Sequence, residues 1–140
     1  MGPLFEQVLE KNPDTLKIAF KNFPINSHKM ARPAAQAAQA ANLQGLFWQY
    51  HDKVFEDYKN LSDEKFITIA QEVGLDLDRF RKDMNSPETQ QLINRDMNDA
   101  ANAGVRGTPT LYLNGRLVKD RSPAGLQSMI DAELRKLKKK

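Results

Sequence analysis

The sequence predicts an α/β protein in which helices outnumber strands, and three observations support this class. Asn114-Gly115 separates two apolar, β-favouring runs, and this pair tolerates the positive φ angles that a type I′ hairpin turn requires. Residues 16–23 alternate loosely between apolar and polar, as a strand does, and Pro24 closes the run. Elsewhere apolar residues recur at helical spacing. The expected order is helix, strand, helical block, hairpin and helix.

The first expected helix covers residues 4–11 and is ended by Asn12-Pro13. Pro3 suits a first helical turn, yet no capping residue precedes it, so we expect this helix to begin in its middle. Its apolar stripe consists of Leu4, Phe5, Val8 and Leu9.

Five short helices are expected between the strand and the hairpin. The first, residues 30–42, is rich in alanine and is stopped by Gly45. Ser and Asp side chains that accept hydrogen bonds from free N–H groups favour helix starts, and they stand at Ser62, Asp76 and Ser86. Five aromatic residues recur at helical spacing between positions 47 and 58, and we expect them to belong to the core and not to line a peptide-binding groove beside Pro109. They are Phe47, Trp48, Tyr50, Phe55 and Tyr58.

The hairpin opens with a proline and is followed by the last helix. Pro109 has no N–H to give to a ladder, so it must lie at a strand start, an edge or a bulge. Ser122-Pro123 then provides a cap and a first helical position. The apolar stripe of this helix consists of Leu126, Met129, Ile130, Leu134 and Leu137.

Length and charge limit the function classes. A chain of 140 residues is expected to form one domain with a real core. Five of the basic residues stand within residues 135–140, and the rest of the chain holds 16 basic and 18 acidic residues, so nucleic-acid binding is not expected. No apolar run approaches the roughly 20 residues that span a bilayer, and the first residues do not read as an export signal.

The residues that usually carry chemistry are sparse. The sequence has no cysteine, which excludes disulfides, thiolate metal sites and thiol chemistry within these residues. His28 and His51 are the two histidines and are not expected to bind zinc. Asp76 starts a run that resembles a calcium loop, but Arg81 and Pro87 stand where glycine and glutamate are needed. We therefore expect no catalytic residue, no metal and no cofactor.

Four segments together carry a family resemblance. They are Lys21-Asn22-Phe23-Pro24, residues 27–35, Phe47-Trp48 with His51-Asp52, and residues 104–110. Their order closely resembles the DsbA-like branch of thioredoxin-fold proteins, a family of thiol:disulfide oxidoreductases, over nearly the whole chain. The resemblance implies one thioredoxin-like domain over residues 1–140, with residues 1–24 and 104–140 as the thioredoxin core and residues 27–103 as a helical insertion.

The same resemblance implies a binding site at the hairpin. Thr108-Pro109 matches the family's cis-proline step, at which the backbone of the preceding residue meets an extended substrate. Gly107, Thr108 and Pro109 are therefore the candidate substrate-binding residues, and the implied partner is an extended polypeptide or a partner strand.

The chain also departs from the family. There, a strand and a Cys-x-x-Cys precede the segment that matches residues 3–11, and this sequence contains neither, so we expect a domain truncated at its first strand and first helix. Thiol–disulfide exchange needs a thiolate, so the chain as given is expected to be redox-inactive. The alternative is a non-catalytic peptide-binding or assembly module that acts through the cis-proline edge and unpaired strands.

The absent strand has a further implication. In the family it lies between the strand that matches residues 16–20 and the one that matches residues 110–113, and unpaired edges invite pairing. A homodimer formed by exchange of a strand or element is therefore expected. The family is mostly extracytoplasmic, in the periplasm, while this chain carries no signal peptide, so the compartment stays open.

Overall fold

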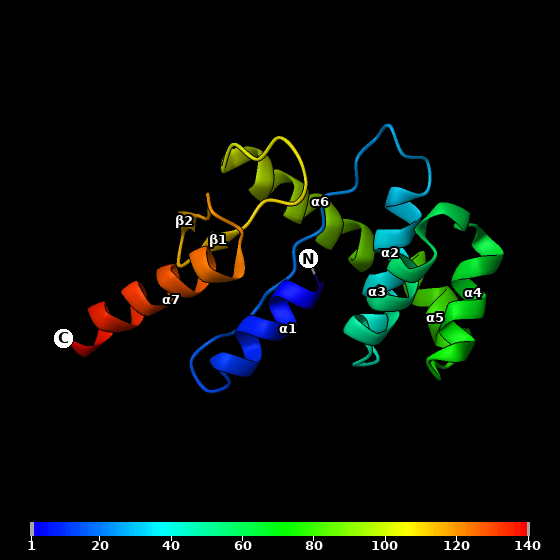
Figure 1. Cartoon of the computed structure of the whole chain (residues 1–140). Coiled ribbons are helices and arrows are strands. Elements are labelled where there is room, and N and C mark those ends of the chain that lie inside the picture. Colours follow the sequence, from blue (N-terminus) through cyan, green and yellow to red (C-terminus); the bar gives the residue numbers. More distant parts are fainter. Residues whose placement is uncertain (1, 140) are drawn as a thin grey trace. The chain divides into compact units, whose positions relative to one another are not determined.

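The computed structural model describes residues 2–139. Within them it contains seven α-helices, one 3₁₀ helix and a two-stranded sheet, so the α/β class with a helical insertion is confirmed. The chain forms two compact units (Figure 1). Unit 1 holds the chain up to Phe20 and from Thr108 onward, and unit 2 is Lys21–Gly107.

Unit 2 is entirely helical in its regular structure (Figure 1). Three of its helices have expected N-terminal caps, and each cap side chain accepts a hydrogen bond from the N–H three residues later, over 3.1 Å at Ser62, 3.1 Å at Asp76 and 3.2 Å at Ser86. The helices are α2 (Ala31–Asn42), α3 (Phe47–Glu56), the 3₁₀ helix η1 (Tyr58–Asn60), α4 (Asp63–Glu72), α5 (Leu77–Met84) and α6 (Pro87–Asn102).

The core of unit 2 is built around α2, which packs against α3, α4, α5 and α6. Alanines at 37, 40 and 41 are fully buried, and their small side chains allow these helices to approach closely. Tyr50, Phe66 and Phe80 fill the remaining space and are also fully buried. The hydroxyl of Tyr50 donates a hydrogen bond to the carbonyl of Phe66 over 2.9 Å, which satisfies the polar end of this side chain.

Unit 1 consists of α1 (Gly2–Lys11), β1 (Tyr112–Leu113), β2 (Arg116–Leu117) and α7 (Pro123–Lys138). The strands are antiparallel, with Tyr112 opposite Leu117. Asn114 and Gly115 between them have φ angles of 47° and 79°, so the predicted type I′ turn chemistry is confirmed. The predicted cap of α7 is also confirmed, because Ser122 Oγ accepts a hydrogen bond from the N–H of Gly125 over 3.0 Å.

A small apolar core joins α1, α7 and the hairpin in unit 1. Its buried members are Val8, Val118, Leu126 and Ile130, and Leu4, Leu16, Leu111, Leu113, Met129 and Leu134 pack around them. Asn12 lies at the edge of this core and is 6% exposed. Its side-chain amide donates to Gln127 over 2.8 Å and accepts from it over 3.2 Å, which fastens the end of α1 to α7.

Two expectations about local structure are wrong. Residues 16–23 form no strand, because a strand needs a backbone ladder and β1–β2 is the single ladder within residues 2–139. The expectation that the five aromatic residues between positions 47 and 58 belong to the core holds for only two of them. Phe47 and Tyr50 lie in the core, whereas Trp48 is 43% exposed and Phe55 and Tyr58 are each 61% exposed. Phe55 follows the buried Val54 directly, so it points about 100° further around the helix.

None of the helices within residues 2–139 combines the length and the apolar composition that crossing a bilayer would require.

Candidate functional site

The candidate site is the chain segment Gly107-Thr108-Pro109, just before the hairpin. Gly107 is half-buried, and Thr108 and Pro109 are exposed. The peptide bond between Thr108 and Pro109 is cis. Thr108 and Pro109 therefore lie at the surface, a few residues before the first strand of unit 1.

Arg121 anchors the carbonyl of this step. Its guanidinium donates a hydrogen bond from an Nη to the carbonyl oxygen of Pro109 over 2.9 Å. Arg121 itself lies directly before the capping residue Ser122, so the start of α7 determines where the guanidinium can reach. Sequence reasoning missed Arg121, because no pattern in the sequence connects a residue at the start of the last helix with Pro109.

Asp120 keeps the loop before α7 in place. One of its carboxylate oxygens accepts a hydrogen bond from the N–H of Ser122 over 3.0 Å. Hydrogen bonds from the side chain and the main chain of Ser122 lower the pKa of this carboxyl group. A charged Asp120 therefore holds the turn that carries Arg121 toward Pro109.

Thr108 offers the backbone groups that a ligand could use. Within residues 2–139, no hydrogen bond involves the N–H or the C=O of Thr108. Pro109 differs in both respects, since it has no N–H and its C=O accepts from Arg121. The step therefore presents one exposed residue with a free donor and a free acceptor, which is the pattern that pairs with an extended chain.

The second candidate feature, the aromatic cluster, lies in unit 2. The His51 ring contacts Phe47, Trp48 and Phe55, with ring centroids 5.6, 5.4 and 4.6 Å away, and its Nδ1 lies 3.1 Å from a carboxylate oxygen of Asp52. His51 is therefore packed among aromatic rings at the helix surface. In the described part of the chain, no group of three or more His, Cys, Asp or Glu residues is placed to hold a metal ion.

Comparison with known proteins identifies the family. The model of the DSBA-like thioredoxin domain matches residues 4–131. The chain belongs to this family. The match begins in α1, includes the Thr108–Pro109 step and ends within α7, so the DSBA-like domain described here contains both units and the candidate site.

Two relatives of this DSBA-like domain are proteins longer than this chain. It is 36% identical over 106 residues to a Na⁺/H⁺ antiporter NhaA of Herminiimonas arsenicoxydans, covering 76% of this chain and 17% of the antiporter. It is 28% identical over 141 residues to a probable disulfide bond formation protein D of Bacillus anthracis, covering 95% of this chain and 64% of that protein. The chain thus spans about a sixth of the antiporter and less than two thirds of the Bacillus protein.

Solved structures confirm the fold of the DSBA-like domain. A thioredoxin-like oxidoreductase from Silicibacter pomeroyi superimposes with a TM-score of 0.81 at 26% identity, over 96% of this chain and 77% of that one. A DsbA of Proteus mirabilis, solved with a non-covalently bound peptide PWATCDS, superimposes with a TM-score of 0.72 at 16% identity, over 94% of this chain and 78% of that one.

Proposed function

We propose that this DSBA-like domain binds extended polypeptide segments at Gly107, Thr108 and Pro109. The observation that carries the proposal is the exposed Thr108, whose N–H and C=O have no hydrogen-bond partner within residues 2–139. In the proposed organisation, residues 1–24 and 104–140 are the thioredoxin core that carries this site, and residues 27–103 are the helical insertion.

The binding step itself uses the main chain. An extended segment placed against Thr108 donates one hydrogen bond to its C=O and accepts one from its N–H, as in β-augmentation. Arg121 already holds the neighbouring Pro109 carbonyl, so the step is ordered before the ligand arrives. Prior ordering reduces the conformational entropy lost on binding and so favours affinity.

The comparisons support a peptide as the class of ligand. The Proteus mirabilis DsbA was solved with a non-covalently bound peptide, and its fold matches this chain. We propose that this chain binds peptides in the same non-covalent way, since its sequence contains no cysteine with which to form a covalent bond to them. The domain as given is therefore proposed to bind peptides without exchanging disulfides and to have no catalytic residue.

The second candidate function is thiol:disulfide exchange by a longer protein of which this chain is one part. The names of the Silicibacter and Bacillus proteins favour it. An insulin-reduction assay with dithiothreitol separates the two candidates for the chain itself. We expect no acceleration over the uncatalysed rate, and acceleration by the purified chain would contradict the proposed redox inactivity.

Peptide titration with NMR detection tests the binding proposal. The probe is PWATCDS, and its scrambled sequence is the control. We expect the amide signal of Thr108 to shift with the probe and much less with the scramble. Thr108→Pro removes the N–H and should weaken binding at least tenfold, while Arg135→Ala, at an exposed position of α7, should leave it unchanged. Binding that leaves the Thr108 signal in place would overturn the proposal.

Self-association is proposed alongside. A two-stranded hairpin is marginally stable by itself, and exchange of a strand or an element between two copies would enlarge the sheet of unit 1. Light scattering from micromolar concentrations upward tests this homodimer, and a strict monomer throughout would contradict it.

A further inference from the structure

Asn114 and Gly115 form the turn of the hairpin, and both residues are exposed. Asparagine is a chemically labile residue, and it loses ammonia when the backbone nitrogen of the next residue attacks its side-chain carbonyl carbon, Cγ. A glycine in the next position favours this attack, because it has no Cβ to obstruct it. A Cβ at Gly115 would meet no atom of a non-neighbouring residue within 4 Å, so no distant part of the chain shields this position.

Few interactions hold the two groups that would react. Among the described residues, the N–H of Gly115 donates to no acceptor. The Nδ2 of Asn114 donates a hydrogen bond to Oε2 of Glu133 on α7, and its length of 3.4 Å lies beyond the usual range for an N–H···O bond. The attacking nitrogen is therefore accessible, and a single long hydrogen bond restrains the side-chain amide that it attacks.

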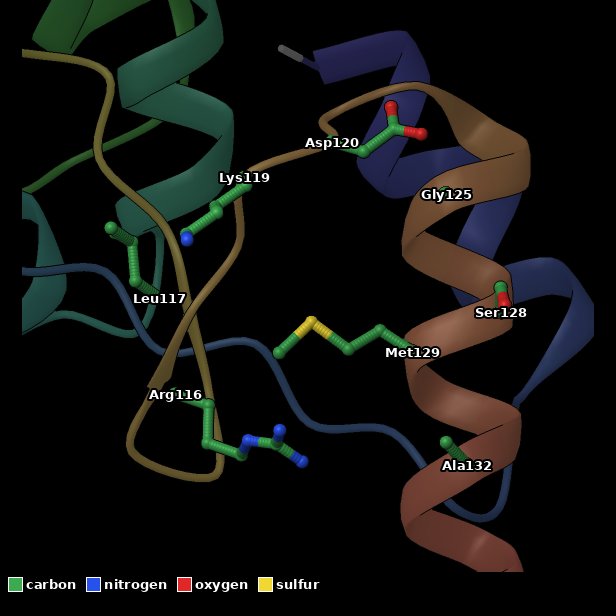
Figure 2. A pocket seen from close by; sticks show the side chains of 8 residues that line it. All are labelled: Arg116, Leu117, Lys119, Asp120, Gly125, Ser128, Met129 and Ala132. Carbon is green, nitrogen blue, oxygen red and sulfur yellow. The ribbon is translucent and has the colours of Figure 1, made fainter.

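The hairpin is small enough to open for this attack, which requires rotation about the Cα–C bond of Asn114. Each of its strands has two residues, and a two-stranded hairpin is marginally stable. A cavity of about 480 Å³ lies between β2 and α7, and the Met129 side chain extends from the helix toward the hairpin without filling it (Figure 2). Few packing contacts therefore oppose a local opening of the turn.

We propose that Asn114 is a site of spontaneous deamidation, at which the hairpin turn is converted to isoaspartate and aspartate and the hairpin is weakened. The nitrogen of Gly115 forms a bond to Cγ of Asn114, the bond from Cγ to Nδ2 breaks, and the amide proton of Gly115 leaves with Nδ2 as ammonia. Water then opens the resulting succinimide ring. Addition of water at Cγ gives aspartate, and addition at the main-chain carbonyl carbon gives isoaspartate.

Both products weaken the attachment of the hairpin to α7. Glu133 holds the hairpin from both sides of the turn, since it accepts from Asn114 and its Oε1 lies 3.3 Å from an Nη of Arg116. A carboxylate at position 114 repels the Glu133 carboxylate and competes with it for Arg116. Isoaspartate also adds a methylene group to the main chain of a two-residue turn, which disrupts its type I′ geometry. Because Leu113 and Val118 pack in the core of unit 1, a loosened hairpin destabilises that core.

Mass spectrometry of the purified full chain during incubation at mildly alkaline pH tests the proposal. Trypsin releases residues 107–116, in which Asn114 is the single asparagine. Incubation in water labelled with heavy oxygen marks the products, and methylation by protein isoaspartate methyltransferase identifies isoaspartate. We expect modification at Asn114 to be at least tenfold faster than at Asn26, an exposed asparagine that precedes a serine, because the serine Cβ obstructs the attack.

Asn114→Gly blocks the reaction and keeps the turn, because Gly-Gly also suits a type I′ turn. The matched control is Asn26→Gly. During incubation the thermal midpoint of the unsubstituted chain and of the control should fall as the modified fraction rises, whereas that of Asn114→Gly should stay constant.

Three results would contradict the proposal. Equal rates at Asn114 and Asn26 would remove the preference for the turn. A full chain that stays unmodified when the isolated peptide 107–116 is half converted would show that the folded hairpin protects Asn114. A thermal midpoint that stays constant in the fully modified chain would rule out the weakening of the hairpin. The first two measurements use the unsubstituted chain, so they decide the site even if Asn114→Gly does not fold.

Discussion

One carboxylate oxygen of Asp96 accepts two hydrogen bonds from Asn22, one from its main-chain N–H over 3.0 Å and one from its side-chain amide over 2.9 Å. Both residues are buried, at 5% and 3% exposure. Asp96 lies on α6, and Asn22 lies in the segment that forms no strand. These hydrogen bonds therefore hold the segment around Asn22 against α6, in place of the backbone hydrogen bonds that a strand would form in a sheet.

Removing the Asp96 carboxylate should destabilise unit 2. Asp96→Ala leaves two donors of Asn22 buried without a partner, which should lower the free energy of unfolding by about 2–3 kcal/mol. Urea denaturation measures the change. The matched control is Asp99→Ala on the same helix, whose side chain is 48% exposed and pairs with Lys21 over 2.6 Å. We expect a clearly smaller loss for the control, and equal losses would contradict the role of Asp96.

Alkaline pH should destabilise the protein through Tyr50. Burial raises the pKa of this phenol, while in the unfolded chain it titrates near about 10. Because the pKa of Tyr50 is higher in the folded state, the unfolded chain releases the phenol proton first as the pH rises. The contribution of Tyr50 to the free energy of unfolding is therefore complete below pH about 10 and is lost as the pH rises further.

The test compares Tyr50→Phe with Tyr58→Phe, since Tyr58 is 61% exposed. Tyr50→Phe should cost about 1–2 kcal/mol at neutral pH, because it removes the hydrogen bond to Phe66. It should also flatten the fall of the thermal midpoint between pH 9 and 11, whereas Tyr58→Phe should leave that fall as it is. A steep fall that persists in Tyr50→Phe would show that other groups cause it.

Acid should destabilise unit 1 through Glu133. Lys136, Asn114 and Arg116, in that order, hydrogen-bond to this carboxylate and lower its pKa. A lowered folded-state pKa means that the contribution is present above the unfolded value of about 4.3 and is lost as the pH falls through the folded value. Glu133→Gln should therefore reduce the difference in urea midpoint between pH 6 and pH 3.5. An unchanged difference would rule out this carboxylate as a source of the acid sensitivity.

Gly125 should not tolerate a larger side chain while Asp120 is present. A Cβ at position 125 would lie 2.2 Å from the carboxyl carbon of Asp120 and 2.7 Å from its Cβ, so Gly125→Ala forces the loop before α7 to move. We expect a loss of about 1–3 kcal/mol in unfolding free energy. Gly2→Ala, with open space around the new methyl group, should change it by less than about 0.5 kcal/mol.

A double-mutant cycle isolates the cause. With Asp120→Ala already in place, Gly125→Ala no longer meets a carboxyl group and gains helix propensity, so its cost should disappear or reverse sign. Thermal unfolding of the four proteins provides the coupling. Independent effects of the two substitutions would contradict the contact between these residues.

Local rules predicted the parts of the fold that depend on neighbouring residues. The type I′ turn follows from Asn114-Gly115, because those residues accept positive φ, and both have it. The capped helix starts at Ser62, Asp76, Ser86 and Ser122 follow from side-chain oxygens that meet nearby N–H groups, and all four form. The family was predicted as well, because its motifs keep their order along the chain.

The features that were missed depend on residues far apart in the sequence. The run at 16–23 has a strand-like pattern, but pairing is a property of two segments, and no second segment forms a ladder with it. The anchoring of Asn22 by Asp96 spans 74 positions. Arg121 reaches Pro109 only because the hairpin folds back between them. At the candidate site, the resemblance to the family predicted the cis peptide bond at Thr108–Pro109, but no sequence pattern predicted that Arg121 binds the Pro109 carbonyl.

The alanines at the centre of unit 2 have a thermodynamic consequence. Alanine has no side-chain rotamers to lose, so burying residues 37, 40 and 41 on α2 costs almost no side-chain conformational entropy. A core of long side chains would lose up to about 2 kcal/mol per residue in this way. Because the alanine side chains are small, the helices of unit 2 pack with their backbones close together. This close packing leaves little room for larger side chains at the centre of the bundle.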